Sequence, residues 1–146
     1  MEKRHLVLDK RGYSTLLWAV FLSTVLIPLL ALTIELSRYF FAAQATANAA
    51  ESAALAAATE IDKNIYESDG RTTLTSSVYT WAQTAALSSS GSLVSAGVNP
   101  KVGQININGT TVQVAVSANL DLLFPSIVPN ITIVKNGTAE VRLLKN

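Results

Sequence analysis

The hydrophobic positions of the chain fall into three successive patterns. A mostly apolar run without a charged side chain occupies residues 16–34 and reads LLWAVFLSTVLIPLLALTI. Alanine then dominates residues 42–58, where it fills eleven of the seventeen positions. After Pro100 apolar residues alternate with polar ones, which is the period of a strand with one buried face. These patterns predict a long N-terminal helix followed by a small domain that contains antiparallel strands.

The run at residues 16–34 is long enough to cross a membrane, because about 20 helical residues span the hydrocarbon core. A cleaved secretory signal normally has an apolar region of about 7–15 residues, so we expect this segment to be retained. Residues 1–13 carry four basic side chains, and positive charge favours the cytoplasmic side. We therefore expect a single-pass membrane protein whose residues 1–13 form a cytoplasmic basic leader or tail and whose head is extracytoplasmic.

The helix is expected to continue beyond the membrane segment. Neither proline nor glycine occurs between residues 29 and 68, and alanine has the highest helix propensity, so the helix should cover residues 14–62. Small side chains allow two helices to approach closely. This packing face either meets other subunits or rests on the chain's own head, and the two uses are compatible on different sides. The small residues of the expected packing stripe are Ala43, Ala47, Ala50, Ala54 and Ala58.

Residues 63–146 predict a small extracytoplasmic α+β head. Apolar residues at helical spacing predict a short helix over residues 72–87, with Trp81 in the core. Asn-Gly at residues 108–109 lies between alternating isoleucines and valines and predicts a hairpin. A two-residue turn at Asn-Gly would place Ile105 opposite Val112.

A second hairpin is expected near the end of the chain. Strands at residues 131–134 and 139–144 would flank a three-residue loop, with Gly137 in the left-handed conformation. The head would thus contain a four-stranded antiparallel sheet of two hairpins against the helices. The connection at residues 120–130 is unexpectedly apolar, and it either covers the sheet edge or presents a patch to a neighbouring subunit. Its apolar residues are Leu122, Leu123, Phe124, Ile127 and Val128.

Composition excludes several kinds of function. The one histidine, His5, precedes the apolar run, and cysteine is absent, so the head has no histidine base and no thiolate metal ligand. Its carboxylates lack calcium-loop spacing, and neither a nucleophile motif nor a phosphate-binding loop occurs. With a net charge of +1 and no basic patch, nucleic acid is not an expected partner. We expect no enzyme activity, no small-molecule substrate, no cofactor and no metal.

Three segments match the acceptor pattern for N-glycosylation, in which asparagine is followed by any residue except proline and then by serine or threonine. They begin at Asn108, Asn130 and Asn136. Two of the three coincide with the expected Asn-Gly turns, which explain the asparagines without a glycan.

One segment resembles a known family. Residues 34–58 read IELSRYFFAAQATANAAESAALAAA, in which Glu35, Arg38, Gln44 and the alanine tract follow an apolar span in order. This order is similar to the N-terminal signature of the TadE/TadG-like pilus-assembly family, and the resemblance covers about residues 10–60. It implies a pilin-like subunit with a hydrophobic helix in the inner membrane and a small outer head. From its position at the end of the apolar run, Glu35 either lies in the lipid headgroup region or pairs with Arg38 one turn on or with an amine of a partner subunit, and the headgroup position is the favoured interpretation.

The resemblance also implies a cleavage site. Members of the TadE-type branch resemble prepilins, which a membrane peptidase cuts after a glycine, and here the corresponding bond joins Gly12 to Tyr13. Prepilins usually carry a glutamate five residues after the cut, whereas this chain has Leu17. The chain departs from the prepilin pattern at that position.

The sequence thus favours a pilin-like structural subunit of a surface filament or of its assembly apparatus. Its expected partners are the membrane, copies of itself or other pilin-like subunits, and the pilus assembly machinery. One alternative is a membrane-anchored binding or sensing module that does not polymerise. Another is a domain released by signal cleavage.

Overall fold

The computed structural model describes residues 10–61, 63–71, 73–91, 93, 97–122 and 130–141. For residues 10, 11 and 63–65 it describes the backbone alone. The chain divides into two compact units, Met1–Ser37 and Arg38–Asn146, so the alanine tract belongs to the same unit as the head.

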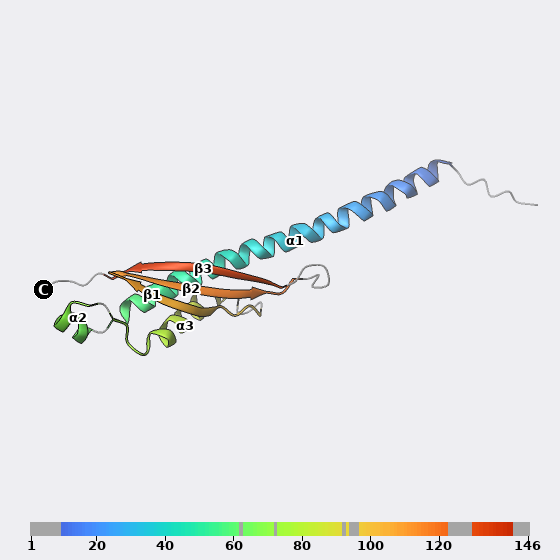
Figure 1. The fold of residues 1–146 in the computed structure, drawn as a ribbon. Helices are drawn as coiled ribbons and strands as arrows, with labels where there is room; N and C mark the ends of the chain where they lie inside the picture. Colours follow the sequence, from blue (N-terminus) through green and yellow to red (C-terminus); the bar gives the residue numbers. More distant parts are fainter. Residues whose placement is uncertain are drawn as a thin grey trace, which may run out of the picture. The chain divides into compact units, whose positions relative to one another are not determined.

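The described elements are three helices followed by three strands (Figure 1). The helices are α1 (Lys10–Thr59), α2 (Lys63–Asp69) and α3 (Val78–Ser89), and the strands are β1 (Lys101–Asn108), β2 (Thr111–Leu120) and β3 (Ile131–Glu140). The strands form one antiparallel sheet in the order β1-β2-β3. The protein is therefore α+β, as the sequence predicts, but its described sheet has three strands and not four.

The hairpin between β1 and β2 forms with a different register from the expected one. Asn108 pairs with Thr111, so the two turn residues are Gly109 and Thr110, and Ile105 lies opposite Val114 instead of Val112. Gly109 has a φ of 61°, and no described residue other than glycine has a positive φ. A turn with Gly109 in first place needs only one positive φ, whereas a type I′ turn at Asn-Gly would need two. The turn therefore shifts by one residue, and apolar side chains still face each other.

The prediction of a second hairpin is wrong, because the residues of the expected loop lie within one continuous strand, β3. Gly137 does not adopt a positive φ; it pairs with Val114 in the middle of the β2–β3 ladder. A Cβ at this position would overlap the backbone carbonyl of Ala50 in α1 and lie 2.6 Å from the amide nitrogen of Glu51. Gly137 is thus required for close contact between a helix and a strand, not for a turn. Residues 142–144 of the other expected strand lie outside the described part of the chain.

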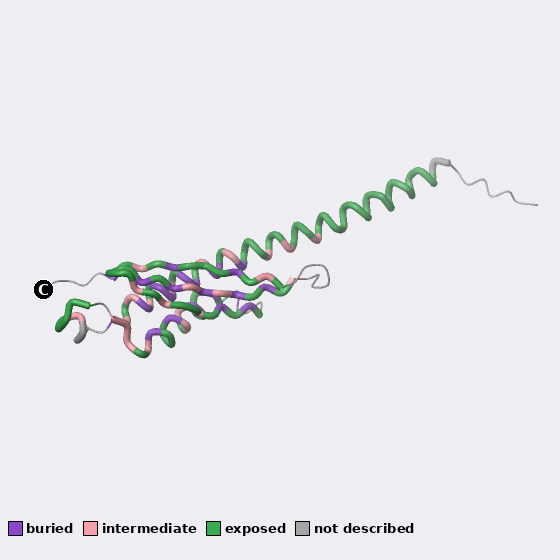
Figure 2. The backbone as a smooth tube through the Cα atoms, in the orientation of Figure 1, coloured by how far each residue is buried: buried purple, intermediate pink, exposed green. Residues whose placement is uncertain are grey.

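The alanine tract of α1 forms the helical side of the core. Figure 2 shows buried residues alternating along β2 and recurring along the part of α1 that belongs to the head. Methyl groups on α1 allow its backbone to lie close to the valines of β2, so the interface is tightly packed despite small side chains. The main cluster contains Ala49, Ala50, Ala53, Ala54, Ala57, Ile61, Val78, Ala82, Ala86, Val112, Val114, Val116 and Val141.

A second cluster continues the core toward the start of the head. Ala42 and Ala45 of α1 pack there with Ala118 and Leu120 of β2. Leu93, Val98 and Ile133 complete the buried cluster, and Leu122 packs against it half-buried. Of the apolar residues expected between β2 and β3, only Leu122 is described; Leu123, Phe124, Ile127 and Val128 lie outside the described residues.

Helix α3 covers the β1 side of the core with a narrow buried face. The side-chain amide of Gln83 donates to the carbonyl of Pro100 (2.9 Å) and accepts from the amide of Val102 (2.8 Å), which satisfies backbone groups at the start of edge strand β1. A bulge between Val102 and Ile105 keeps both side chains on the core side. The prediction that Trp81 is a core residue is wrong, because 55% of its surface is exposed. Ala82 lies at the buried position next to it.

A short segment containing α2 connects α1 to α3, and its two ends lie next to each other at the core. We refer to this segment, between Ile61 and Leu74, as the α2 excursion. Ile61 and Leu74 form an isolated antiparallel bridge at its base. The carboxylate of Glu60 accepts hydrogen bonds from the hydroxyls of Thr75 (3.0 Å) and Ser77 (2.9 Å), and the amide of Thr75 donates to the Glu60 carbonyl (3.0 Å). These bonds join the end of α1 to the start of α3. The excursion is therefore closed at its base by Glu60.

Replacing Gly137 with alanine should destabilise the head by about 3 kcal/mol, because the added methyl group cannot avoid the backbone of α1. Urea unfolding of the full chain in detergent, followed by circular dichroism, measures this loss. Gly91→Ala is the matched control, since a Cβ at Gly91 would meet no atom within 4 Å and its φ is not positive. Equal stability of the two variants would contradict the close contact.

Candidate functional site

The candidate site is the surface of α1. The type and the exposure of its side chains differ between the two compact units. In the first unit, residues 12–37 expose nearly every side chain. A helix of this length and apolar composition is sufficient to cross a membrane, and its most apolar window has no buried residue. Side chains of this kind exposed along a whole helix are suited to lipid or to other apolar helices.

Four hydroxyl groups of this apolar section, residues 12–37, are satisfied within the helix itself. Ser23 and Thr24 both donate to the carbonyl of Val20, at 2.9 and 2.8 Å. Thr33 donates to Leu29 and Ser37 donates to Thr33, each at 2.8 Å. Because these hydroxyls are paired with the backbone of their own helix, they add little to the cost of placing this section in a lipid core.

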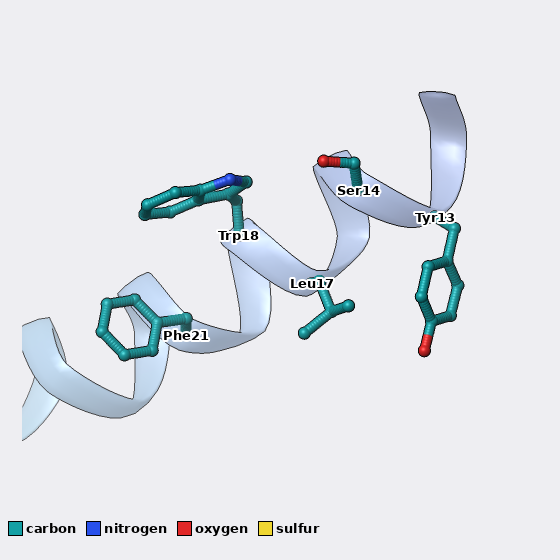
Figure 3. A pocket seen from close by; sticks show the side chains of 5 residues that line it. All are labelled: Tyr13, Ser14, Leu17, Trp18 and Phe21. Atoms are coloured by element: carbon teal, nitrogen blue, oxygen red, sulfur yellow. The ribbon is translucent and has the colours of Figure 1, made fainter. Parts of the chain in front are cut away.

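A shallow apolar groove lies on the surface of the first turns of α1. Figure 3 shows the side chains of Tyr13, Ser14, Leu17, Trp18 and Phe21 along its consecutive turns. The rings of Trp18 and Phe21 meet edge to face with centroids 5.9 Å apart. A groove made by one helix alone does not enclose a small ligand. Its aromatic residues are of the type found where a transmembrane helix meets the membrane surface.

The residues of the expected cleavage site lie at the start of α1. Gly12 and Tyr13 are both exposed, and a Cβ at Gly12 would meet no atom within 4 Å. Leu17, which stands where prepilins carry a glutamate, is 53% exposed beside them and lines the apolar groove. Cleavage at this bond stays a prediction.

In the second unit, the expected packing stripe divides between two environments. Ala50 and Ala54 are fully buried against the chain's own sheet. Ala43, Ala47 and Ala58 are half-buried at the margin of that contact. Of the two uses that the sequence left open, contact with the own head is thus observed for the two central alanines. Packing against another subunit stays a prediction, for which the three marginal alanines are accessible.

The exposed side of this section is polar with one large apolar residue. Gln44, Asn48, Glu51 and Leu55 follow one another at helical spacing, and all four are exposed. The Gln44 amide donates to Asn48 at 3.4 Å. Leu55 is 64% exposed, which is unusual beside a head whose other aliphatic side chains are mostly buried. This stripe is one part of the head's own α1 that remains available for contact.

The two expected charge-pair residues, Glu35 and Arg38, lie in different units. Glu35 is half-buried in the first unit. Arg38 is the first residue of the second unit, and its guanidinium donates to the backbone carbonyl of Asp121 at 3.1 Å. Arg38 therefore ties the start of the head to the end of β2. A role of either residue between subunits stays a prediction.

The three glycosylation-type asparagines are all exposed. Asn108 ends β1 beside the tight turn, and Asn130 immediately precedes β3. Asn136 lies within β3 opposite Ala115, so a turn does not explain its Asn-Gly pair. They share the outer sheet surface with a row of uncharged polar side chains, in which Thr132 donates to Asn119 at 2.9 Å. Modification of these asparagines stays a prediction.

Sequence reasoning missed two features of the head. The closure of the α2 excursion by Glu60 has no local motif, since its partners are 15 and 17 residues away. Two aromatic side chains on α3, Tyr79 and Trp81, are exposed, which the apolar spacing of this short helix did not indicate. Among the residues whose placement is described, no group of three acidic or histidine side chains gathers to hold a metal.

Comparison with known proteins concerns this same helix. Residues 12–60 match the family model described as putative Flp pilus-assembly TadE/G-like. The match extends over α1 from Gly12 and ends one residue after Thr59. It confirms the TadE/TadG-like resemblance and places it on the apolar section together with the alanine tract. The comparisons with curated proteins and with solved structures gave no match.

Replacing Ala54 with leucine should lower the free energy of unfolding by about 1–3 kcal/mol, because a larger side chain overpacks the contact with the sheet. The same change at half-buried Ala47 should cost less than about 1 kcal/mol. Urea unfolding of both full-length variants in detergent measures the difference. Equal losses would show that the head does not depend on the small size of Ala54.

Proposed function

We propose that this chain is a pilin-like structural subunit of a surface filament or of its assembly apparatus. The observation that carries the proposal is the coincidence of the TadE/G-like match with α1, the one described helix able to cross a membrane. In this proposal residues 1–13 are a cytoplasmic leader or tail, residues 14–62 form the membrane helix with its alanine-rich extension, and residues 63–146 form the extracytoplasmic head. The role is structural and not enzymatic.

The proposed assembly contact uses α1 in two ways. Its apolar section, with every large side chain exposed, packs against the equivalent sections of other subunits within the membrane or the filament. Its alanine section presents the stripe of Gln44, Asn48, Glu51 and Leu55, bordered by Ala43, Ala47 and Ala58. Small residues at this border allow a second helix to approach. Glu35 and Arg38 lie between the two sections and supply charges for pairing with a neighbour.

Processing is the second part of the proposal. Cleavage between Gly12 and Tyr13 would remove the basic leader and leave the exposed aromatic groove at the new N-terminus. Leu17 would then pack with apolar neighbours in place of the charge contact that a glutamate makes in prepilins. Asn108, Asn130 and Asn136 are accessible for glycosylation in a host that performs it.

One observation favours a second candidate function. Tyr79 and Trp81 expose about half of their surfaces on α3, 52% and 55% respectively. Exposed aromatic side chains are enriched at recognition surfaces. They suit a membrane-anchored binding or sensing module that does not polymerise.

Shearing of cells that carry surface fibres separates the two functions. A filament subunit should co-sediment with the sheared fibres, and sequencing of that fraction should begin at Tyr13. Ala47→Leu should reduce the protein in the fibre fraction several-fold, because it enlarges the border where another helix approaches. Ala85→Leu on α3, which is also half-buried, is the matched control and should leave the fraction unchanged.

Two results would contradict the proposal. If fibres are present while the protein stays wholly in the membrane fraction, the chain is an anchored module. If Ala47→Leu and Ala85→Leu behave alike, the alanine border is not an assembly contact. An intact Met1 in the mature protein would refute cleavage alone.

A further inference from the structure

The head exposes aromatic side chains at the end where α1 enters it. Phe40 and Phe41 are 61% and 56% exposed, and Tyr39 is 37% exposed. The rings of Tyr39 and Phe40 meet at 5.9 Å. Consecutive helical residues point in directions about 100° apart, so these three side chains surround much of the helix. Such a collar of aromatic residues is unfavourable in water because it leaves a large apolar area hydrated.

The collar follows directly after the apolar section along one helix. If that section spans the membrane, Ile34 marks the last residue of its uncharged run. Arg38 then lies about 6 Å farther along the helix axis and Phe41 about 10 Å farther, at 1.5 Å per residue. The interfacial layer on each side of a bilayer is about 5–8 Å thick. Arg38 and Tyr39 thus fall within this layer, and Phe40 and Phe41 lie at its outer margin.

A second part of the head reaches the same level. The guanidinium of Arg38 donates to the carbonyl of Asp121, 3.1 Å away, so the end of β2 lies one arginine side chain from the start of the head. Leu120 and Ile131 form the last pair of the β2–β3 ladder, so both described ends of the connection between these strands leave the sheet here. The connection's sequence from Leu122 to Pro129 contains no charged side chain.

We propose that this end of the head, formed by Arg38, Tyr39, Phe40, Phe41 and the end of β2 at Asp121 and Leu122, docks on the lipid surface. The occupant is lipid because the surface continues an apolar membrane helix without a break in the chain. Tyr39 is of the kind enriched in the headgroup layer, and Phe40 and Phe41 are apolar side chains of the kind that membrane-surface helices turn toward lipid. Arg38 suits this position too, since its charged group reaches the polar layer while its stem lies along apolar surface. This inference rests on the membrane anchoring in the proposed function and adds a second contact with the bilayer.

Single-cysteine variants test the contact, because the chain has no native cysteine. The full chain is reconstituted in phosphatidylcholine vesicles after labelling with an environment-sensitive fluorophore at Phe41→Cys or Asp121→Cys. Asp121 uses only its backbone carbonyl to bind Arg38, and its side chain is exposed, so this change keeps the contact. Lipids that carry a nitroxide on the headgroup, or in the middle of an acyl chain, report the depth of the label.

Labels at three control positions provide the reference values for quenching. Tyr79→Cys matches Phe41→Cys as an exposed aromatic on a helix, and Asp69→Cys matches Asp121→Cys. Asp69 lies in α2, which follows α1 at the opposite end of the head's sheet from Asp121 (Figure 1). Leu26→Cys lies in the apolar section and tests the membrane span itself. We expect headgroup nitroxide to quench Phe41→Cys and Asp121→Cys several-fold more than their matched controls, and acyl-chain nitroxide to quench Leu26→Cys.

The outcomes distinguish this inference from the proposed anchoring. If Leu26→Cys is quenched while Phe41→Cys and Asp121→Cys resemble their controls, the span stands and the lipid contact is refuted. If the two labels report an apolar environment that lipid nitroxide does not quench and that depends on the protein-to-lipid ratio, a second copy covers the surface, and the lipid contact is again refuted. If Leu26→Cys is not quenched, the membrane span and the lipid contact both fail.

Discussion

The contact between the backbone of α1 at Ala50 and the backbone of β3 at Gly137 is the constraint on which the head depends. A side chain on the strand at this point would hold the two backbones apart, and Gly137 has none. The valines of β2 then fill the space beside the contact, against alanines that recur on one side of α1. A core made of methyl and isopropyl groups gains its stability from tight packing, because each alanine buries little area by itself.

This close packing explains how α1 can form part of the core of the head and still expose a surface for contact. The side of α1 that carries Ala50 and Ala54 is buried by the sheet, while Gln44, Asn48, Glu51 and Leu55 remain exposed on the same turns. The head therefore covers only part of the helix circumference. The apolar section before Arg38 exposes nearly every side chain, and four of its hydroxyl groups are bonded to its own backbone, which suits an environment without water. The TadE/G-like match covers both sections.

Much of the site was accessible to sequence reasoning, because it depends on local properties of one helix. Helix propensity, the length of the uncharged run and the order of Glu35, Arg38 and Gln44 do not require knowledge of distant contacts. Which alanines of the stripe become buried, in contrast, does depend on distant contacts. Ala47 and Ala54 are the same residue type in the same stripe, yet Ala47 is half-buried and Ala54 is fully buried, since of the two only Ala54 packs in the main cluster with the valines of β2. The same limit of local reasoning applies to the short helix α3, where Ala82 faces the core and its neighbour Trp81 does not.

The sequence by itself determined the long apolar helix, the α+β class and the hairpin between β1 and β2, because these follow from periodicity and from the positive φ that Gly109 adopts. Only the tertiary structure decided that β3 is one strand. Lys135 occupies a core-side position there but remains exposed at the sheet edge, and with Gly137 it interrupts the apolar alternation, so the segment looks like a loop. An Asn-Gly pair in a turn and an Asn-Gly pair in a strand that packs against a helix have the same local sequence. The difference lies in Ala50, 87 residues earlier in the chain, whose backbone leaves no room for a side chain.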